Sequence, residues 1–158
     1  MPNSSHEKRP GVVAGLAYRP VDGDAMAEIS HCSVEPGRGI VLENRKPGNR
    51  EITLIAAETW RDVCRELEVE LPWHARRANV LTRGLDLSAA IGQKLAIGTV
   101  VILVHGETKP CGIMDQQFDG LKKALGPDFR GGVYGQVLTA GTIQIGTPIE
   151  FLRASRPE

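Results

Sequence analysis

Short apolar segments, cut by glycine and proline, run along most of this chain and limit the folds open to it. The sequence holds 18 glycines and 10 prolines among its 158 residues. Runs of four to nine residues bounded by turn residues are typical of β-strands. The segments of this kind are residues 12–18, 27–34, 39–43, 52–55, 99–107, 132–138, 142–146 and 148–152. The pattern therefore predicts many short strands joined by tight turns.

Only two segments have the periodicity of a helix. Residues 56–72 place Trp60, Val63, Cys64 and Leu67 at positions i, i+3, i+4 and i+7, which is one face of an amphipathic helix, and Pro72 closes it. Cys64 lies on that face, so we interpret it as a packing residue.

Residues 117–129 predict a second, shorter helix with Phe118, Leu121 and Leu125 on one side. Many strands with one or two short helices favour a mainly β, closed, barrel-like fold over a parallel sheet. A chain of this length fits one domain, and it shows no internal repeat. We expect a tail over residues 1–10, a domain over 11–152 and a second tail over 153–158.

Charge and cysteine content exclude several classes of protein. The 19 basic and 19 acidic residues balance, whereas a general nucleic-acid-binding protein usually has a basic excess. No segment has the length of a membrane span or the apolar region of a signal peptide, so we expect a cytoplasmic protein. The three cysteines form no CxxC pair, which is a poor basis for disulfides or zinc. Of the neighbours His31 and Cys32, alternation along a strand turns one inward and the other outward.

Cys111 is the strongest candidate for chemistry. It follows the apolar run 99–107 and stands between Pro110 and Gly112, which favours a loop at the end of a strand. Gly112 permits a ligand to approach the backbone, and Lys109 lies close enough in sequence to lower the thiol pKa, while Asp115 opposes this effect. The competing interpretation is a small buried residue at a turn.

Two further groups could bind an anion. Arg130 precedes Gly131 and Gly132, where backbone N–H groups and a guanidinium could converge, although the same sequence is typical of a hairpin turn with a solvated arginine. Strand alternation would place Arg77 and Asn79 on one face, opposite Ala78 and Val80. That face could bind a phosphate or the edge of a heterocycle, or could simply face water.

Taken in order, these segments resemble the MOSC domain, named after the C-terminal part of molybdenum cofactor sulfurases. The matching elements are Arg50 before the strand 52–55, the segment RRANVLTRGLDL at 76–87, the run LAIGTVVILVHGETKPC that ends at Cys111, and the closing RGGVYGQVLTAGTIQIGTPI. The resemblance covers roughly residues 11–152. Many members carry a Gly-Asp-x-His motif in the first third, where this chain has Glu35-Pro36-Gly37-Arg38-Gly39.

The resemblance implies a β-barrel-like fold that binds molybdenum cofactor (molybdopterin) or carries sulfur for it. Cys111 would then be the catalytic residue and the metal site, either as a thiolate ligand of molybdenum or as a persulfide carrier. The residues implied for cofactor binding are Arg77, Asn79, Arg130, Gly131, Gly132, Tyr134, Arg50 and Arg38. A pyridoxal phosphate-dependent cysteine desulfurase, or a redox protein, would be a separate partner.

Two alternatives stay open at this point. The chain could be a molybdenum-dependent reductase module for N-hydroxylated compounds, with electrons supplied by the redox partner. It could also be a non-catalytic binding or scaffold domain in which Cys111 is structural. Neither nucleic acid nor a membrane is expected as a partner.

Overall fold

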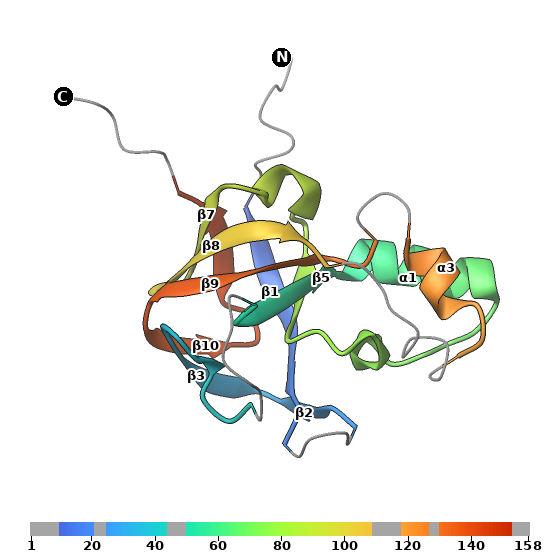
Figure 1. The fold of residues 1–158 in the computed structure, drawn as a ribbon, viewed down its shortest axis with the longest axis horizontal. Helices are drawn as coiled ribbons and strands as arrows, with labels where there is room; N and C mark the ends of the chain where they lie inside the picture. The colour runs from blue at the N-terminus through green and yellow to red at the C-terminus, as the bar shows by residue number, and fades with distance from the viewer. Residues whose placement is uncertain (1–9, 21–24, 44–49, 109–117, 127–129, 153–158) are drawn as a thin grey trace, which may run out of the picture.

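A closed β-barrel forms the body of the molecule (Figure 1). The computed structural model describes residues 10–20, 25–43, 50–108, 118–126 and 130–152 of the chain. Within them, eight strands form one sheet in the order β11-β7-β8-β9-β5-β6-β1-β2, and β11 also pairs with β1. That pairing closes the barrel and leaves β2 as an extension of β1. The expected mainly β, barrel-like fold with one or two short helices is confirmed.

The barrel strands are mostly antiparallel neighbours, with one parallel pair between β5 and β6. Their bounds are β1 (Gly11–Tyr18), β2 (Ala27–Ile29), β5 (Ile52–Ala56), β6 (Val80–Arg83), β7 (Lys94–Ile97), β8 (Val100–Glu107), β9 (Val133–Thr139) and β11 (Pro148–Phe151). A smaller sheet contains β3 (His31–Glu35), β4 (Gly39–Ile40) and β10 (Gly141–Gln144), in the order β10-β3-β4.

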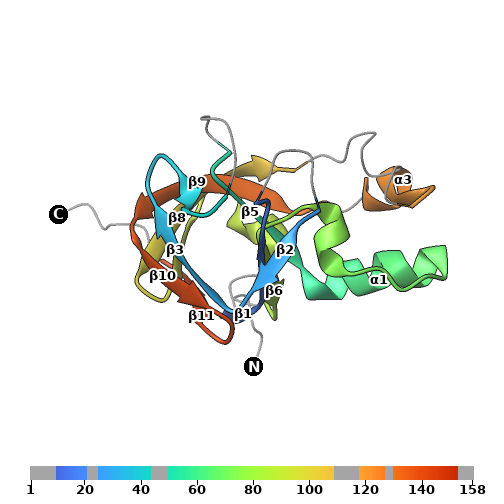
Figure 2. The ribbon, with the colours of Figure 1, turned by 90° about the horizontal axis from the view of Figure 1, so that it is seen from below.

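One apolar cluster fills the barrel because alternate residues of each strand point inward. In β8, Val100, Ile102 and Val104 are buried, and the residues between them are more exposed. The small sheet belongs to the same cluster through Cys32 and Ile143. Figure 2 looks into the barrel and shows β3 and β10 lying across one side of it.

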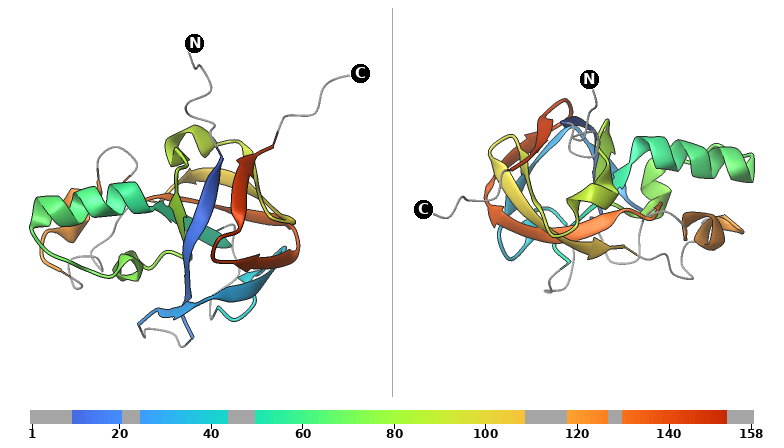
Figure 3. Two further views of the ribbon diagram at one scale, coloured as in Figure 1. Left: turned by 180° about the vertical axis from the view of Figure 1, so that it is seen from behind. Right: turned by 90° about the horizontal axis from the view of Figure 1, so that it is seen from above.

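The helices lie beside the barrel rather than around it (Figure 3). They are α1 (Ala57–Leu67), α3 (Leu121–Leu125) and the 3-10 turn η2 (Trp73–Arg76). A further 3-10 turn, η3 (Leu87–Ala90), lies at one end of the barrel (Figure 3), where Leu87 and Ala90 join the cluster that fills it. A second apolar cluster joins α1, η2 and α3 to the outer side of β5 through Ile55. It includes Trp60, Val63, Leu121 and Leu125, as the helical spacing of the sequence predicts. None of the helices among the described residues is long and apolar enough to span a membrane.

The expected alternation over residues 77–80 is wrong. Arg77 ends η2 with a positive φ of 69°, and β6 begins only at Val80. Ala78, Asn79 and Val80 are all buried, and the backbone of Asn79 is hydrogen-bonded to Thr53 of β5 on one side and to Ala17 of β1 on the other. Alternation applies only to extended strand residues, and here the chain is still leaving a turn.

Candidate functional site

The segment that carries Cys111 lies outside the described residues, but the structure shows where the chain enters it. β8 ends at Glu107, and the backbone N–H of Thr108 donates to the carbonyl of Gly132 at 2.9 Å. The register of β8 on β9 places Glu107 opposite Val133 and Gly106 opposite Tyr134. Thr108, the last described residue before this segment, therefore lies beside the start of β9, where several of the predicted cofactor-binding residues lie.

Gly131 and Gly132 are buried at this point, and Gly132 has a clear packing role. Its φ is +90°, and a Cβ at this position would lie 2.0 Å from the carbonyl oxygen of Leu54 in β5. Only glycine allows the chain to pass this close to another backbone. The close approach explains Gly132 without a ligand, and its role in anion binding stays a prediction.

Arg50 and Tyr134, two of the predicted cofactor-binding residues, contact each other. The guanidinium carbon of Arg50 lies 4.8 Å from the centre of the Tyr134 ring, a cation–π contact. Arg50 is exposed and Tyr134 half-buried, and within the described part of the chain neither side chain makes a hydrogen bond or ion pair. A cation stacked on an aromatic ring offers both charge and a flat surface to an anionic, planar ligand.

Asn79 is buried, with 5% of its surface exposed, and its amide bonds to residues from three other parts of the chain. The Oδ1 atom accepts from the backbone N–H and the hydroxyl of Thr53, each at 3.1 Å. The Nδ2 atom donates to the carbonyl of Ala17 and to Oε1 of Glu43, each at 3.2 Å. Since the amide is occupied by protein partners, Asn79 acts here by fixing β1, β5 and the start of β6.

Thr53 connects this hub to the Arg50–Tyr134 pair, because it lies opposite Tyr134 in the register of β5 on β9. Arg50, Tyr134, Thr53 and Asn79 thus share one region of the barrel wall. No local sequence pattern indicates this hub, because the partners of Asn79 lie 26 to 62 residues away along the chain.

Arg130 points toward the helices. Its Nη2 lies 2.5 Å from Oε2 of Glu66 in α1, and its Nη1 donates to the carbonyl of Ala124 in α3 at 3.2 Å. The hydrogen bond from Arg130, with its charge, lowers the pKa of Glu66 below the ordinary value of 4.5, although desolvation acts in the opposite direction. Only 18% of the Arg130 side chain is exposed, so its ion pair with Glu66 has a structural role.

Arg77 and Arg38 are placed by their local turns. The backbone N–H of Arg77 donates to the carbonyl of His74 at 2.8 Å and ends η2. Arg38 is exposed, and its Nε and Nη2 donate to the carbonyl of Val41 at 2.9 and 2.6 Å. The turn between β3 and β4 is closed by the backbone N–H of Arg38, which donates to the carbonyl of Glu35 at 3.2 Å.

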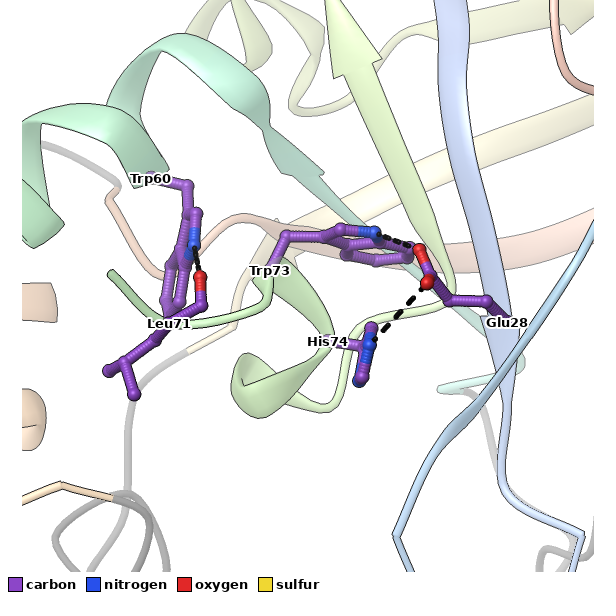
Figure 4. Close-up of polar contacts among 5 residues, drawn as sticks. All are labelled: Glu28, Trp60, Leu71, Trp73 and His74. Carbon is purple, nitrogen blue, oxygen red and sulfur yellow. Dashed lines mark hydrogen bonds and ion pairs between the residues drawn. The ribbon is translucent and has the colours of Figure 1, made fainter.

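Sequence reasoning missed the contacts that hold η2 against the barrel (Figure 4). Trp73 Nε1 donates to Oε2 of Glu28 at 3.0 Å, and His74 Nε2 lies 3.8 Å from the other carboxylate oxygen. The indole also covers Gly15, where a Cβ would lie 3.1 Å from Nε1. Glu28 in β2 therefore fixes the turn that leads to Arg77 and Asn79.

The two described cysteines differ in environment. Cys32 is 4% exposed in β3, and burial raises its thiol pKa from 9.0 to about 11, while its neighbour His31 faces solvent. Cys64 is half-buried and packs against the cluster between α1 and η2, as expected, but it also lines a shallow hollow of about 430 Å³ beside Arg61 and Arg65. Among the described residues, no group of three or more His, Cys, Asp and Glu side chains could hold a metal ion.

The described residues form a small closed barrel. Four of the candidate site residues lie where β8 ends and β9 begins: Arg50, Gly131, Gly132 and Tyr134. A model of the MOSC domain matches residues 23–150, which is most of the chain. The protein therefore belongs to the MOSC domain family. The family resemblance of the sequence is confirmed.

Solved structures show the same fold. YuaD protein from Bacillus subtilis matches with a TM-score of 0.78 and 15% identity, over 91% of this chain and 96% of that chain. YiiM from Geobacillus stearothermophilus matches with a TM-score of 0.74 and 16% identity, over 90% and 75%. YiiM from Escherichia coli matches with a TM-score of 0.71 and 16% identity, over 92% and 72%. No curated protein matches the sequence significantly.

Proposed function

We propose that this MOSC-family protein binds molybdenum cofactor, or carries sulfur for it, at the end of β8, with Cys111 as the reactive thiol. One observation carries the proposal. The chain enters the segment of Cys111 beside the Arg50–Tyr134 pair, since Thr108 is bonded to Gly132 and Gly106 lies opposite Tyr134. The cation and the flat ring therefore lie beside the last described residues before that segment.

The residues present fit an anionic, planar cofactor only in part. The Arg50 guanidinium could pair with a phosphate, and the Tyr134 ring could pack against a flat heterocycle. Asn79 and Arg130 would support the site without contacting the cofactor, because their side chains already bond to other protein groups. Asn79 bonds to Thr53, Ala17 and Glu43. Arg130 bonds to Glu66 and Ala124. Bound molybdenum cofactor would supply a redox-active metal centre, and the protein residues would orient it.

The other cysteines support Cys111 as the thiol that acts. Cys32 is buried in β3 with a pKa raised to about 11, and a thiol must ionise to bind metal or attack sulfur. Cys64 lies in α1, in the cluster on the helical side of the barrel. As a carrier, the Cys111 thiolate would attack the outer sulfur of a donor persulfide, and the donor thiolate would leave.

The test is the intact mass of the native protein, purified without oxygen from a host that makes molybdenum cofactor. Cys111→Ala is the variant, and Cys64→Ala is its matched control. A cofactor-sized adduct that is absent only from Cys111→Ala supports ligation. An adduct of one sulfur atom that is absent only from Cys111→Ala supports the carrier role.

A bare mass in all three proteins, after incubation with both the cofactor and a persulfide donor, would contradict the proposal. It would instead favour a binding or scaffold domain in which Cys111 is structural. An adduct that survives in Cys111→Ala but is lost in Cys64→Ala would assign the reactive thiol to α1.

A further inference from the structure

Glu51 is a buried carboxylate that neither the sequence patterns nor the proposed site accounts for. It lies directly before β5, between Arg50 and Ile52, and only 6% of its surface is exposed. A glutamate is almost never buried unless its charged group is paired or hydrogen-bonded. The hydrogen-bond partners of Glu51 therefore indicate what the carboxylate does.

The carboxylate extends the pairing between β5 and β9. The register of these strands ends with Ile52 opposite Gly135, so β5 does not reach Val137. The backbone N–H of Glu51 donates to the carbonyl of Gly135 at 3.0 Å, and Oε1 of Glu51 accepts the backbone N–H of Val137 at 3.0 Å. A side chain thus replaces the backbone acceptor that a longer β5 would provide, and Arg50 is not part of the strand.

The same oxygen holds the turn between β3 and β4. Oε1 of Glu51 also accepts the backbone N–H of Gly37 at 3.1 Å. Gly39 packs against the backbone of Glu51, where a Cβ would overlap the Glu51 carbonyl oxygen. The turn carries Arg38, another predicted cofactor-binding residue. One carboxylate oxygen therefore joins the β3–β4 turn to β9, although the two segments lie far apart in the sequence.

The position of Arg50 depends on where its backbone is held. Its guanidinium carbon lies 4.8 Å from the centre of the Tyr134 ring, and among the described residues its side chain makes no hydrogen bond or ion pair. A single cation–π contact at an exposed site is weak, so it cannot fix a long side chain alone. The hydrogen bonds of Glu51, the next residue, are the nearest described ones that anchor this part of the backbone.

We infer that Glu51 is a positioning residue of the proposed cofactor site: its carboxylate holds Arg50 over the Tyr134 ring and fixes the β3–β4 turn against β9. Glu51 acts through these neighbours and not by contacting a ligand, because its carboxylate is buried and already accepts two backbone N–H groups. The inference rests on the proposed function for what Arg50 binds. The placement of Arg50 and of the turn depends only on the contacts of Glu51.

The experiment compares the native sequence with Glu51→Ala, Glu51→Gln and Glu51→Asp by NMR of the full chain. The first signal is the chemical shift of the Arg50 Hδ protons, which the ring current of Tyr134 moves upfield, and Tyr134→Leu identifies this shift. The second signal is the protection of the Val137 amide against hydrogen exchange. Val63→Ala is the control, because Val63 of α1 is fully buried in the other apolar cluster and its truncation destabilises the protein away from the site.

We expect Glu51→Ala to lose most of the Arg50 shift and of the Val137 protection, because both backbone N–H groups lose their acceptor. Glu51→Gln should retain both signals, since an amide oxygen accepts the same hydrogen bonds. Glu51→Asp keeps the charge on a shorter side chain that does not reach both donors, so it should weaken both signals even where Glu51→Ala does not fold. Val63→Ala should lower Tm and leave both signals unchanged.

Three results would overturn the inference. One is an unchanged Arg50 shift in the folded variants among Glu51→Ala and Glu51→Asp. Another is a loss in Glu51→Gln as large as in Glu51→Ala, because the acceptor oxygen would then have no part in the effect. The third is the same loss in Val63→Ala, which would assign the effect to general destabilisation.

The positioning result is separable from the result at Cys111. After anaerobic loading with cofactor, Glu51→Ala should hold less molybdenum than Glu51→Gln. No bound molybdenum in any of these proteins, together with the expected changes of the Arg50 shift, would count against the ligation form of the proposed function alone. Bound molybdenum in the native protein, together with an Arg50 shift that does not respond to Glu51, would count against the positioning role alone.

Discussion

At the scale of single residues, Gly132 shows how a motif can be required by packing. Its positive φ and its contact with the Leu54 carbonyl leave no space for a side chain. Gly92 also has a positive φ, of +80°, but a Cβ there meets nothing within 4 Å. A comparison of alanine substitutions at the two glycines therefore separates the cost of a steric clash from the cost of backbone strain.

Gly132→Ala should therefore lose at least about 3 kcal/mol of unfolding free energy, because strain and a backbone clash add together. Gly92→Ala should lose about 1 kcal/mol, from strain alone. Urea unfolding followed by circular dichroism measures both. Equal losses in the two variants would mean that β9 can move away from β5 at little cost.

The described cysteines give a second prediction at this scale. With a pKa of about 11, Cys32 is almost entirely a neutral thiol at pH 8, and it is also buried, so alkylation of the native protein should be slow. Cys64, which borders an open hollow, should react first of the two. Iodoacetamide labelling followed by peptide mass analysis checks the order. Labelling of Cys32 as fast as in unfolded protein would refute the buried placement.

At the scale of elements, the Glu66–Arg130 ion pair joins α1 to the start of β9, and Arg130 also reaches α3. The pKa of Glu66 is lowered in the folded protein, so its contribution is present above pH 4.5 and is lost as pH falls through the lowered value. Glu66→Gln should lower Tm at pH 7, and the difference from the native sequence should shrink at about pH 3.

Asp62→Asn is the matched control for Glu66→Gln. Asp62 pairs with Arg65 at 3.9 Å, and both side chains are exposed, so its loss should change Tm little at either pH. A Tm difference for Glu66→Gln that does not depend on pH would show that the carboxylate charge has no part in the contact.

The Glu28–Trp73 bond also acts between elements, since it fixes η2 on β2. Glu28→Leu should lower the unfolding free energy by about 1 kcal/mol, because the indole N–H loses its acceptor. Glu28→Gln keeps an acceptor and should retain most of that stability. Urea unfolding followed by tryptophan fluorescence separates the two variants. A loss as large in Glu28→Gln would assign the effect to the contact of the carboxylate with His74 instead.

At the scale of the whole molecule, closure of the barrel depends on β11, which pairs with β7 on one side and β1 on the other. A chain cut after Thr147 would expose both edges and remove the buried Ile149, and we expect it to unfold or aggregate. A chain cut after Leu152 keeps β11 and should match the full chain in Tm. A folded, monomeric protein without β11 would contradict the closed barrel.

Local sequence patterns predict much of this fold. Apolar runs indicate β1, β5 and β8, and the spacing of Trp60 and Val63 indicates α1. Long-range contacts cannot be predicted from local patterns, because they join residues far apart in the sequence. The contacts of this kind are the β1–β11 closure, the Arg130–Glu66 pair and the hydrogen bonds of Asn79. Alternation also failed at Asn79, because the turn that ends η2 at Arg77 delays the start of β6.

The central claim is that molybdenum cofactor is held beside Arg50 and Tyr134 through Cys111. The most direct measurement is the molybdenum content per protein, after anaerobic loading with cofactor, of the native sequence, Arg50→Ala and Cys111→Ala, with Arg61→Ala on α1 as control. We expect bound molybdenum in the native protein and Arg61→Ala, a clear decrease in Arg50→Ala and near absence in Cys111→Ala. Equal molybdenum in all four proteins, or none in any, would contradict ligation of the cofactor through Cys111 and leave only the sulfur-carrier form of the proposal.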